Sequence, residues 1–232
     1  METATTRTEL LLGVEHLEKL SKSTVLVLGL GGVGGFACEA LARSGIGKLI
    51  IVDSDTVNIS NLNRQIIATK ETIGRLKTEV MKERIEAISE AEVEIINAFV
   101  DKDFIIPKCD YVVDCIDTMT SKFYIQKQSS ILKIPCISSL GMANRLDPSK
   151  IIATTLDKTS YDPLAKALRT FAKKEKYYNK IKVVFSTEIP MKKTLYNEEG
   201  STMKQKHILS SMIFVPAAAG LKLASVVIEE LK

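Results

Sequence analysis

The sequence predicts an α/β fold built as a doubly wound, mainly parallel sheet. Short apolar runs alternate with amphipathic stretches along the chain, which is the pattern of successive strand–helix–strand units. A glycine cluster separates the first apolar run from the helix that follows it, and Asp53 ends the second run. A glycine-rich turn and an acidic residue at these two points are typical of Rossmann-like sheets. We therefore expect a Rossmann-like core with a mixed extension at the C-terminal end.

The first part of the chain supplies most of the predicted sheet. Residues 10–20 are expected to form one helix, because leucine and valine recur there at three- and four-residue spacing. Short, mostly apolar runs rich in valine and isoleucine indicate buried strands. The predicted strands are 24–28, 48–52, 93–98, 111–115 and a run beginning at 135, and the predicted helices between them are 33–44, 72–88 and 119–132.

The alternating pattern weakens after Gly141. Asp162-Pro163 indicates the start of a helix, since aspartate caps helices and proline suits the first turn. The elements expected in this part are a strand at 151–155, a helix from 163 to about 176, a strand at 182–185, a mobile polar loop at 190–206, a strand at 212–215 and a helix at 217–231.

Composition narrows the classes of protein that need to be considered. Lysine and arginine total 32 against 28 acidic residues, a net charge of +4 that permits a polyanionic partner without requiring one. The cysteines Cys38, Cys109, Cys115 and Cys136 form no C-x-x-C pair, so no zinc site is expected. The start of the chain is polar, and no run reaches the roughly 18 apolar residues of a membrane span. We expect a cytoplasmic protein without membrane contact.

The glycine cluster predicts a phosphate-binding turn. It reads Gly29-Leu-Gly31-Gly32-Val-Gly34 and lies between a predicted strand and a predicted helix. Glycine lets the backbone approach a phosphate closely, and the amides at the start of the helix attract an anion. Asp53 is in the position of an acid that hydrogen-bonds ribose hydroxyls. This pattern by itself leaves NAD, FAD and ATP open as ligands.

The side chains after the second strand favour a triphosphate over a nicotinamide. The segment is rich in groups that can hold phosphate oxygens, namely Asn61, Arg64, Gln65 and Lys77. Asp114 and Asp117 follow another predicted strand at its carboxyl end, where α/β sheets bind their ligands. A carboxylate there can hold Mg²⁺ beside phosphates. We expect Lys77 to be partly exposed, as a side chain that reaches a ligand.

These motifs resemble the ubiquitin-activating-enzyme-like (HesA/MoeB/ThiF) superfamily, which includes the molybdopterin and thiamine adenylyltransferases. The matching segments are Gly29-x-Gly31-Gly32-x-Gly34, Asp53-x-Asp55, Ser60-Asn61-x-Asn63-Arg64-Gln65, Gly74-x-x-Lys77 and Asp114-x-x-Asp117. The resemblance implies ATP and Mg²⁺ as cofactors, with Asp53 on the ribose and the four polar residues on the triphosphate. It implies that Asp117 supports the metal or the reacting phosphate. It also implies a two-fold homodimer in which an N-terminal arginine, here Arg7, reaches the γ-phosphate of the partner subunit.

Further segments narrow the resemblance to the tRNA threonylcarbamoyladenosine dehydratases. They are residues 7–13, 39–47, 162–165 and 185–188. The resemblance implies ATP-dependent dehydration of the modified adenosine beside the anticodon of tRNA, through an acyl-adenylate, with Arg64, Lys77, Asp117 and Arg7 as catalytic residues. It also implies one ligase-like adenylating domain over 1–232, with a nucleotide-binding core at 1–140 and a substrate- and tRNA-facing part at 141–232.

The cysteine positions bear on the main alternative, an adenylyltransferase that activates the C-terminal Gly-Gly of a ubiquitin-like sulfur carrier. Such enzymes carry paired zinc ligands, and some carry a thioester-forming thiol. This chain lacks the pairs and has no cysteine after Cys136, which favours the dehydratase. A dehydrogenase or a non-catalytic nucleotide-binding module is the other alternative. The sequence leaves open which tRNAs are used, which cyclic product forms, and whether a sulfur-transfer partner docks.

A basic run in the second half is a candidate contact for tRNA. It carries Lys166, Arg169, Lys173, Lys174, Lys176, Lys180 and Lys182 against the single acid Glu175, with Tyr177 and Tyr178 inside it. Lysine can neutralise RNA phosphates and aromatic rings can stack on bases. Lys192, Lys193, Lys204 and Lys206 flank the predicted loop and could add to the contact. A solvated helix face explains the run equally well from sequence alone.

Overall fold

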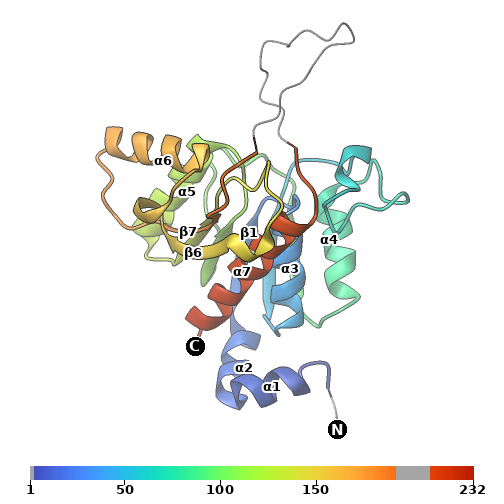
Figure 1. Cartoon of the computed structure of the whole chain (residues 1–232). Helices are drawn as coiled ribbons and strands as arrows, with labels where there is room; N and C mark the ends of the chain where they lie inside the picture. Colours follow the sequence, from blue (N-terminus) through green and yellow to red (C-terminus); the bar gives the residue numbers. More distant parts are fainter. Residues whose placement is uncertain (1–2, 192–209) are drawn as a thin grey trace, which may run out of the picture.

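A seven-stranded sheet in the order β3-β2-β1-β4-β5-β7-β6 runs through the centre of the protein (Figure 1). The computed structural model describes residues 3–191 and 210–232. The strands are β1 Thr24–Leu28, β2 Lys48–Val52, β3 Glu92–Ile96, β4 Tyr111–Asp114, β5 Cys136–Ser139, β6 Ile151–Thr155 and β7 Lys182–Ser186. Neighbouring strands are parallel except β6 and β7, which are antiparallel. The doubly wound, mainly parallel sheet with a mixed C-terminal extension is therefore confirmed.

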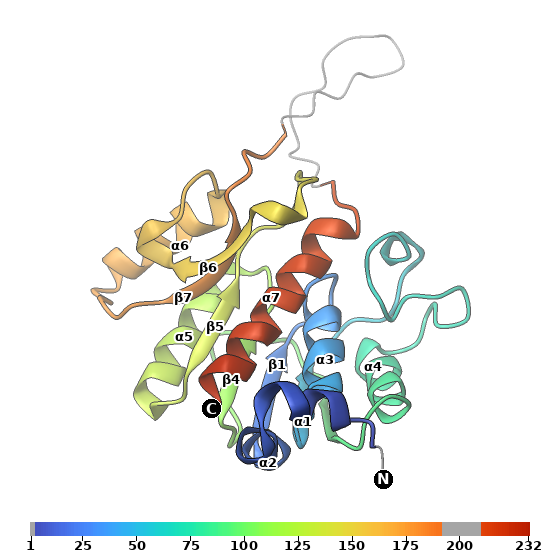
Figure 2. The ribbon, with the colours of Figure 1, turned by 60° about the horizontal axis from the view of Figure 1, so that its bottom comes forward.

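Helices cover both faces of this sheet, so its central strands are apolar on both sides. The helices are α1 Thr6–Leu12, α2 Val14–Lys22, α3 Gly34–Arg43, α4 Lys77–Glu86, α5 Met119–Leu132, α6 Pro163–Lys174 and α7 Phe214–Glu230, with short 3-10 turns η1 Ile59–Asn61, η2 Pro148–Lys150 and η3 Leu156–Lys158. Residues of α3, α4 and α7 share one core with the sheet. Residues of α5 and α6 belong to the cores of the opposite face. Figure 2 shows α7 and α3 side by side on the same face of the sheet.

Three elements differ from the sequence-based expectation. The single helix predicted over 10–20 is broken at Gly13, which has a φ of 86° and separates α1 from α2. The helix predicted from 72 begins at Lys77, because residues 69–75 form turns that tie back to Val57. The strand predicted at 212–215 is wrong, since α7 already begins at Phe214. Pro216 lies in the first turn of α7, where its missing N–H costs no hydrogen bond.

Most of the predicted mobile loop, including Lys192, Lys193, Lys204 and Lys206, lies outside the described residues. Within the part of the chain that is described, none of the helices combines the length and the apolar character that a membrane span requires.

Candidate active site

A cavity of about 370 Å³ opens where β1, β2 and β4 end, at the carboxyl edge of the sheet. Because neighbouring strands are parallel, the loops that follow them meet at this edge. The predicted site residues that line it are Gly29, Gly31, Gly32, Asp53, Asp55, Asn61, Arg64, Gln65, Lys77 and Asp117. The structure thus brings together residues from loops that lie far apart in the sequence.

The glycine turn forms the floor of this cavity. Gly29 has a φ of 86°, a conformation that favours glycine. Gly34 does not line the cavity; it begins α3 directly beneath the turn, where an added Cβ would lie 1.8 Å from the carbonyl oxygen of Gly29. No side chain within the described residues caps α3, so the amides at its start are directed toward the cavity without a competing side chain. This is the geometry that favours phosphate.

The carboxylate of Asp53 is held in place by backbone amides. Leu30 N donates to one oxygen at 2.7 Å and Asp55 N donates to the other at 2.8 Å. These bonds turn the side chain toward the glycine turn and leave further lone pairs for a ligand. The predicted position of an acceptor for ribose hydroxyls therefore lies beside the predicted phosphate site.

Lys77 is buried beside two carboxylates, so the expectation of a partly exposed lysine is wrong. Only 6% of the residue is accessible, and Nζ lies 2.7 Å from Asp55 Oδ2 and 3.9 Å from Asp53 Oδ1. The backbone amide of Lys77 also donates to the carbonyl of Asp55, which fixes the start of α4 against the loop after β2. Asp55 is itself largely exposed, so an entering phosphate could take its place as the partner of the ammonium group.

Asn61, Arg64 and Gln65 approach the cavity from the turn that includes η1. Arg64 donates to the carbonyl of Ser60 and to Asn63 Oδ1, both at 2.9 Å, and keeps further N–H groups available. Gln65 is 7% exposed, and its Oε1 has no hydrogen-bond partner within the described residues. A buried, unpaired amide oxygen costs about 1–3 kcal/mol unless a ligand satisfies it. This group is therefore poised to meet a bound molecule.

The aspartate that ends β4 and the one three residues later have different positions. Asp114 is fully buried and paired with Lys122, so it points into the protein, whereas Asp117 lines the cavity. Within residues 3–191 and 210–232, no group of three or more histidine, cysteine, aspartate or glutamate side chains could hold a metal ion by itself. A Mg²⁺ ion bound through one carboxylate and the phosphates of a nucleotide fits this donor set.

A second cavity of about 640 Å³ adjoins the first, and both are lined by Gly32, Val33, Arg64 and residues 115–117. Its other walls come from the loop after β5, the start of α6 and residues 210–211. These walls lie in the part of the chain where the sequence pattern was weak, although Asp162-Pro163 marks one of them. Two molecules bound in these cavities would meet at Arg64 and Asp117.

Arg145 holds the wall of the second cavity together and was not predicted from sequence. Its buried guanidinium donates to the carbonyls of Gly141, Tyr161 and Glu188, and lies 3.6 Å from Asp162. Burial lowers the pKa of Arg145, and the neighbouring carboxylates oppose that shift. One side chain thereby ties the loop after β5 to the start of α6 and to the end of β7.

Phe99 and Cys115 also line the first cavity, the one that contains the glycine turn. Phe99 follows β3 and is 64% exposed, so its ring can contact an aromatic base. In the sequence, the only sign that Phe99 would line this cavity is its position directly after a strand of the parallel sheet. The atoms packed around Cys115 raise its thiol pKa to about 12, so the sulfur stays protonated and a weak nucleophile near neutral pH.

Arg7 lies away from both cavities in the same chain. It belongs to α1, and α1 and α2 precede β1 at the edge of the sheet opposite the glycine turn (Figure 1). A contact between Arg7 and a nucleotide in its own subunit is therefore excluded by the length of β1, about 16 Å.

A family model described as the ThiF family matches residues 5–181 of this chain. The chain belongs to the ThiF family. Among its curated relatives, the tRNA threonylcarbamoyladenosine dehydratase of Bacillus subtilis is 42% identical, over 97% of this chain and 93% of that protein. The enzyme of the same name from Escherichia coli is 39% identical over 68% of this chain and 61% of that protein.

Solved structures of tRNA threonylcarbamoyladenosine dehydratases also resemble this ThiF family member. The structure described as TcdA (CsdL) superimposes with a TM-score of 0.88 and 33% identity, covering 98% of this chain and 93% of the other. The Escherichia coli tRNA N6-threonylcarbamoyladenosine dehydratase TcdA in complex with ATP superimposes with a TM-score of 0.87 and 32% identity, covering 97% and 92%. The resemblance inferred from the motifs is therefore confirmed.

Proposed function

We propose that this protein uses ATP to dehydrate N6-threonylcarbamoyladenosine beside the anticodon of tRNA, through an acyl-adenylate. The observation that carries the proposal is the pair of adjoining cavities with Arg64 and Asp117 in both linings. The smaller cavity has the glycine turn and acidic residue suited to ATP. The larger has room for a modified nucleoside. The dehydratase relatives, similar over nearly the whole chain, support this choice of substrate.

ATP would bind with its ribose on Asp53 and its adenine near Phe99. The glycine turn would hold phosphates through backbone amides, as helix starts commonly do. The side chains for the remaining phosphate oxygens are Asn61, Arg64, Gln65 and Lys77. Gln65 can turn its amide so that either the NH₂ or the oxygen meets the ligand.

The chemistry is an attack of the threonyl carboxylate on the α-phosphorus, with pyrophosphate as leaving group. Negative charge develops on the α-phosphate and on the departing oxygen. Arg64 and Lys77 would stabilise that charge from fixed positions, which is the largest contribution in most phosphoryl transfers. Lys77 would exchange the exposed carboxylate of Asp55 for phosphate as the nucleotide enters.

The second step needs no group from the protein as nucleophile. A nitrogen or oxygen of the carbamoyl group attacks the acyl carbon, AMP leaves, and the attacking group loses its proton. Since both groups belong to one nucleoside, their effective concentration is high. The net change is loss of water from the substrate and conversion of ATP into AMP and pyrophosphate. The protonated Cys115 is consistent with a route that uses no thioester.

Mg²⁺ would be held by Asp117 together with the phosphates, and would supply positive charge beside the reacting phosphorus. Asp117 follows β4 in a segment common to both cavities, which suits a group near the reacting atoms. No zinc is needed in this scheme.

A homodimer would let Arg7 act on the nucleotide of the partner subunit. Leu10 and Leu11 beside it in α1 are 83% and 82% exposed, which supports burial of this helix against a second copy. The setting would be the cytoplasm, where tRNA is available. A sulfur-transfer partner is not required by the chemistry.

The proposal is tested by incubating the purified protein with ATP and tRNA, with and without the threonylcarbamoyl group. We expect AMP release only with the modified tRNA, and mass spectrometry of its nucleosides should show a loss of one water. AMP release that ignores the modification would contradict the assignment. Titration with NAD in place of ATP would detect a dehydrogenase.

A sulfur-carrier adenylyltransferase is the second candidate. Its support is a 36% identity to the molybdopterin-synthase adenylyltransferase of Haemophilus influenzae over 66% of this chain. That function predicts exchange of pyrophosphate into ATP that depends on a carrier protein ending in Gly-Gly. Observing such exchange, with no response to modified tRNA, would reverse the order of the two candidates.

A further inference from the structure

The basic residues around α6 divide into two groups in the structure. Arg169 donates to the carbonyl oxygens of Leu156 and Thr159 and so ties α6 to η3. Lys182 forms an ion pair of 2.6 Å with Glu230, which ties β7 to α7. These cations already have internal partners, so they are poor candidates for binding an external anion.

The other lysines of this run face solvent. Ala165, Leu168 and Ala172 form the buried side of α6, and the helix contains no acidic residue. The exposed lysines are Lys166, Lys173, Lys174, Lys176 and Lys180. None of them forms an ion pair with a described residue, whereas lysines elsewhere in the described chain often do. Glu175 within the run and Asp157 near Lys180 offset only part of this charge, so the lysines form a positively charged surface.

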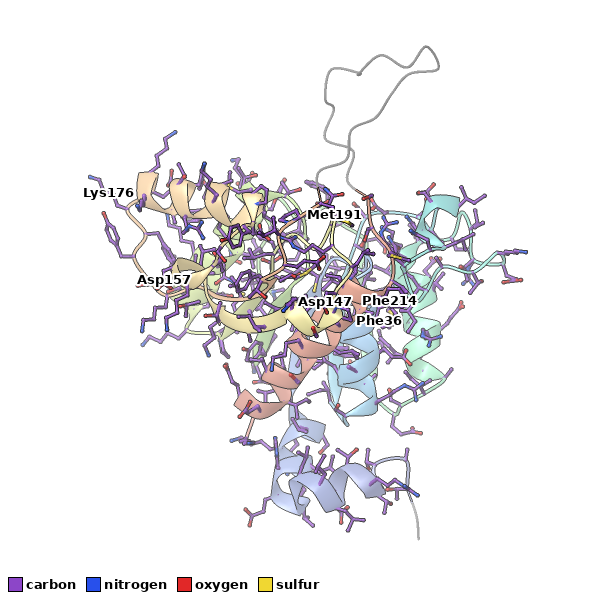
Figure 3. All side chains as sticks on the ribbon, viewed as in Figure 1. Phe36, Asp147, Asp157, Lys176, Met191 and Phe214 are labelled. Atoms are coloured by element: carbon purple, nitrogen blue, oxygen red, sulfur yellow. The ribbon has the colours of Figure 1, made fainter. Side chains whose placement is uncertain are left out.

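This surface leads away from the larger cavity. Pro163 and Leu164 at the start of α6 line that cavity. The 12 residues of α6 span about 18 Å, and Figure 3 shows Lys176 at the far end, at the margin of the molecule. A polyanion with one residue in the cavity would therefore have its neighbouring residues within reach of the lysines.

An exposed aromatic ring lies within the same surface. Tyr178 is 81% exposed, whereas Tyr177 beside it packs on Phe123. A tyrosine ring that covers no apolar neighbour is available to stack on an unpaired base. Lysines alone would suit an acidic protein equally well, but an exposed ring on a surface that begins at a nucleoside-sized cavity favours RNA.

We propose that the α6 surface, defined as Lys166, Lys173, Lys174, Lys176, Tyr178 and Lys180, binds the tRNA backbone beside the nucleotide held in the larger cavity, and binds an unpaired base a few nucleotides away from it. This inference rests on the proposed function. It assigns to α6 the sequence-independent part of tRNA affinity, which phosphate neutralisation supplies. The residues that line the two cavities, and not those of the α6 surface, carry out the reaction.

The test compares two variants of equal charge change in the full chain. In the α6 variant, Lys166, Lys173 and Lys174 are replaced by glutamine, which keeps a high helix propensity. In the control variant, the exposed residues Lys22, Lys108 and Lys133 are replaced by glutamine. These precede β1, β4 and β5, and so lie at the edge of the parallel sheet opposite both cavities.

We expect the α6 variant to bind tRNA at least about tenfold more weakly at low salt. The slope of log affinity against log salt should become shallower by about 2, since each phosphate contact contributes about 0.7 for single-stranded nucleic acid. Affinity for ATP and turnover at saturating tRNA should stay at the wild-type level. The control variant should bind tRNA like the wild type.

Each departure from this result has a distinct meaning. If the wild type binds tRNA and the α6 variant binds it equally well, the inference about α6 is wrong and the proposed function stands. If the wild type does not bind tRNA, both are wrong. If the α6 variant keeps its tRNA affinity and loses only the affinity for polyglutamate, the surface belongs to an acidic protein partner, and the inference is again overturned.

A separate pair of substitutions tests the stacking contact. Tyr178→Ala should weaken tRNA binding by roughly tenfold, the effect expected of one lost base–aromatic stack. Tyr178→Phe should bind tRNA normally because stacking does not use the hydroxyl. An equal loss in both variants, or no loss in the alanine variant, would show that the ring does not stack on the RNA.

Discussion

Lys122 and Asp114 form an ion pair inside the protein, with 2.9 Å between Nζ and Oδ1 and both side chains fully buried. The hydroxyl of Ser138 donates to the other carboxylate oxygen at 2.5 Å, and Lys122 also donates to the backbone carbonyl of Asp114. Asp114 ends β4, and residues 115–117 that follow it line both cavities. The pair therefore fixes the segment that presents Asp117.

This buried pair should show strong coupling in unfolding measurements. Asp114→Asn is expected to lower the free energy of unfolding by about 3–5 kcal/mol, because it leaves an ammonium group buried without a counter-charge. Lys122→Met should cost a similar amount. The double variant should recover much of the loss, since both charges leave together. Urea unfolding of the four proteins gives the coupling energy, and losses that simply add would contradict the pairing.

Lys77→Ala should reduce adenylate formation far more than it reduces stability. We expect pyrophosphate exchange to fall by about 10²–10³, the usual cost of removing one group that stabilises developing charge. The loss of stability should be much smaller, because Asp55, the close partner of the ammonium group, is already solvated and Asp53 keeps its two backbone N–H hydrogen bonds. Lys82→Ala, on a half-buried lysine of the same helix, is the control. Wild-type exchange in the Lys77 variant would exclude its catalytic role.

Alanine substitutions at two glycines of the turn should affect different properties, stability at Gly34 and ATP affinity at Gly31. A Cβ at Gly34 would lie 1.8 Å from the carbonyl oxygen of Gly29, so Gly34→Ala should lower stability by at least about 1–3 kcal/mol. At Gly31 the nearest atom to an added Cβ is 4.0 Å away, so Gly31→Ala should fold normally and lose ATP affinity, because the methyl group enters the cavity. Thermal unfolding and ATP titration of each variant distinguish these outcomes. Normal stability of the Gly34 variant would contradict the close contact.

Mixed subunits can test whether Arg7 acts across a dimer. Arg7→Ala and Asp53→Ala should each be inactive alone. When the two variants are mixed and allowed to exchange subunits, one site of the heterodimer should contain both native residues. We expect about a quarter of the wild-type activity to return, since half of the dimers are mixed and each has one complete site. No recovery in dimers that have demonstrably exchanged subunits would argue against cross-subunit action.

The Cys109 thiol should make stability fall in alkaline solution. Burial raises its pKa from an ordinary 9.0 to about 11. Below pH 9 the thiol is protonated in both states, so its full contribution is present. Between pH 9 and 11 only the unfolded state releases the proton, and the free energy of unfolding should fall by about 1.4 kcal/mol per pH unit. Urea unfolding across this range should show a shallower decline for Cys109→Ala. Equal slopes would mean that the thiol titrates normally when folded.

Local patterns accounted for much of the fold and for the nucleotide-sized cavity. The glycine turn and Asp53 could be located because strand, turn and helix follow one another within a short stretch. Arg145 and the larger cavity could not be located, because that cavity's walls come from segments after β5, before α6 and at the start of α7. The prediction of a strand at 212–215 was wrong because local sequence did not distinguish the start of α7 from a strand. An apolar run at the edge of a helix looks the same in sequence as a buried strand.

The sequence alone determined most of the order of strands and helices, the phosphate turn and the superfamily, because these depend on neighbouring residues and their spacing. The tertiary structure decided which charged side chains are free to bind a partner and which are already engaged inside the protein. Lys77 and Lys122 are both buried beside aspartates, and Arg169 is bound to backbone carbonyls, while Lys173 faces solvent without a partner in the described chain. A charged side chain is free or engaged according to groups that packing brings from distant parts of the chain, and that information is absent from any single segment.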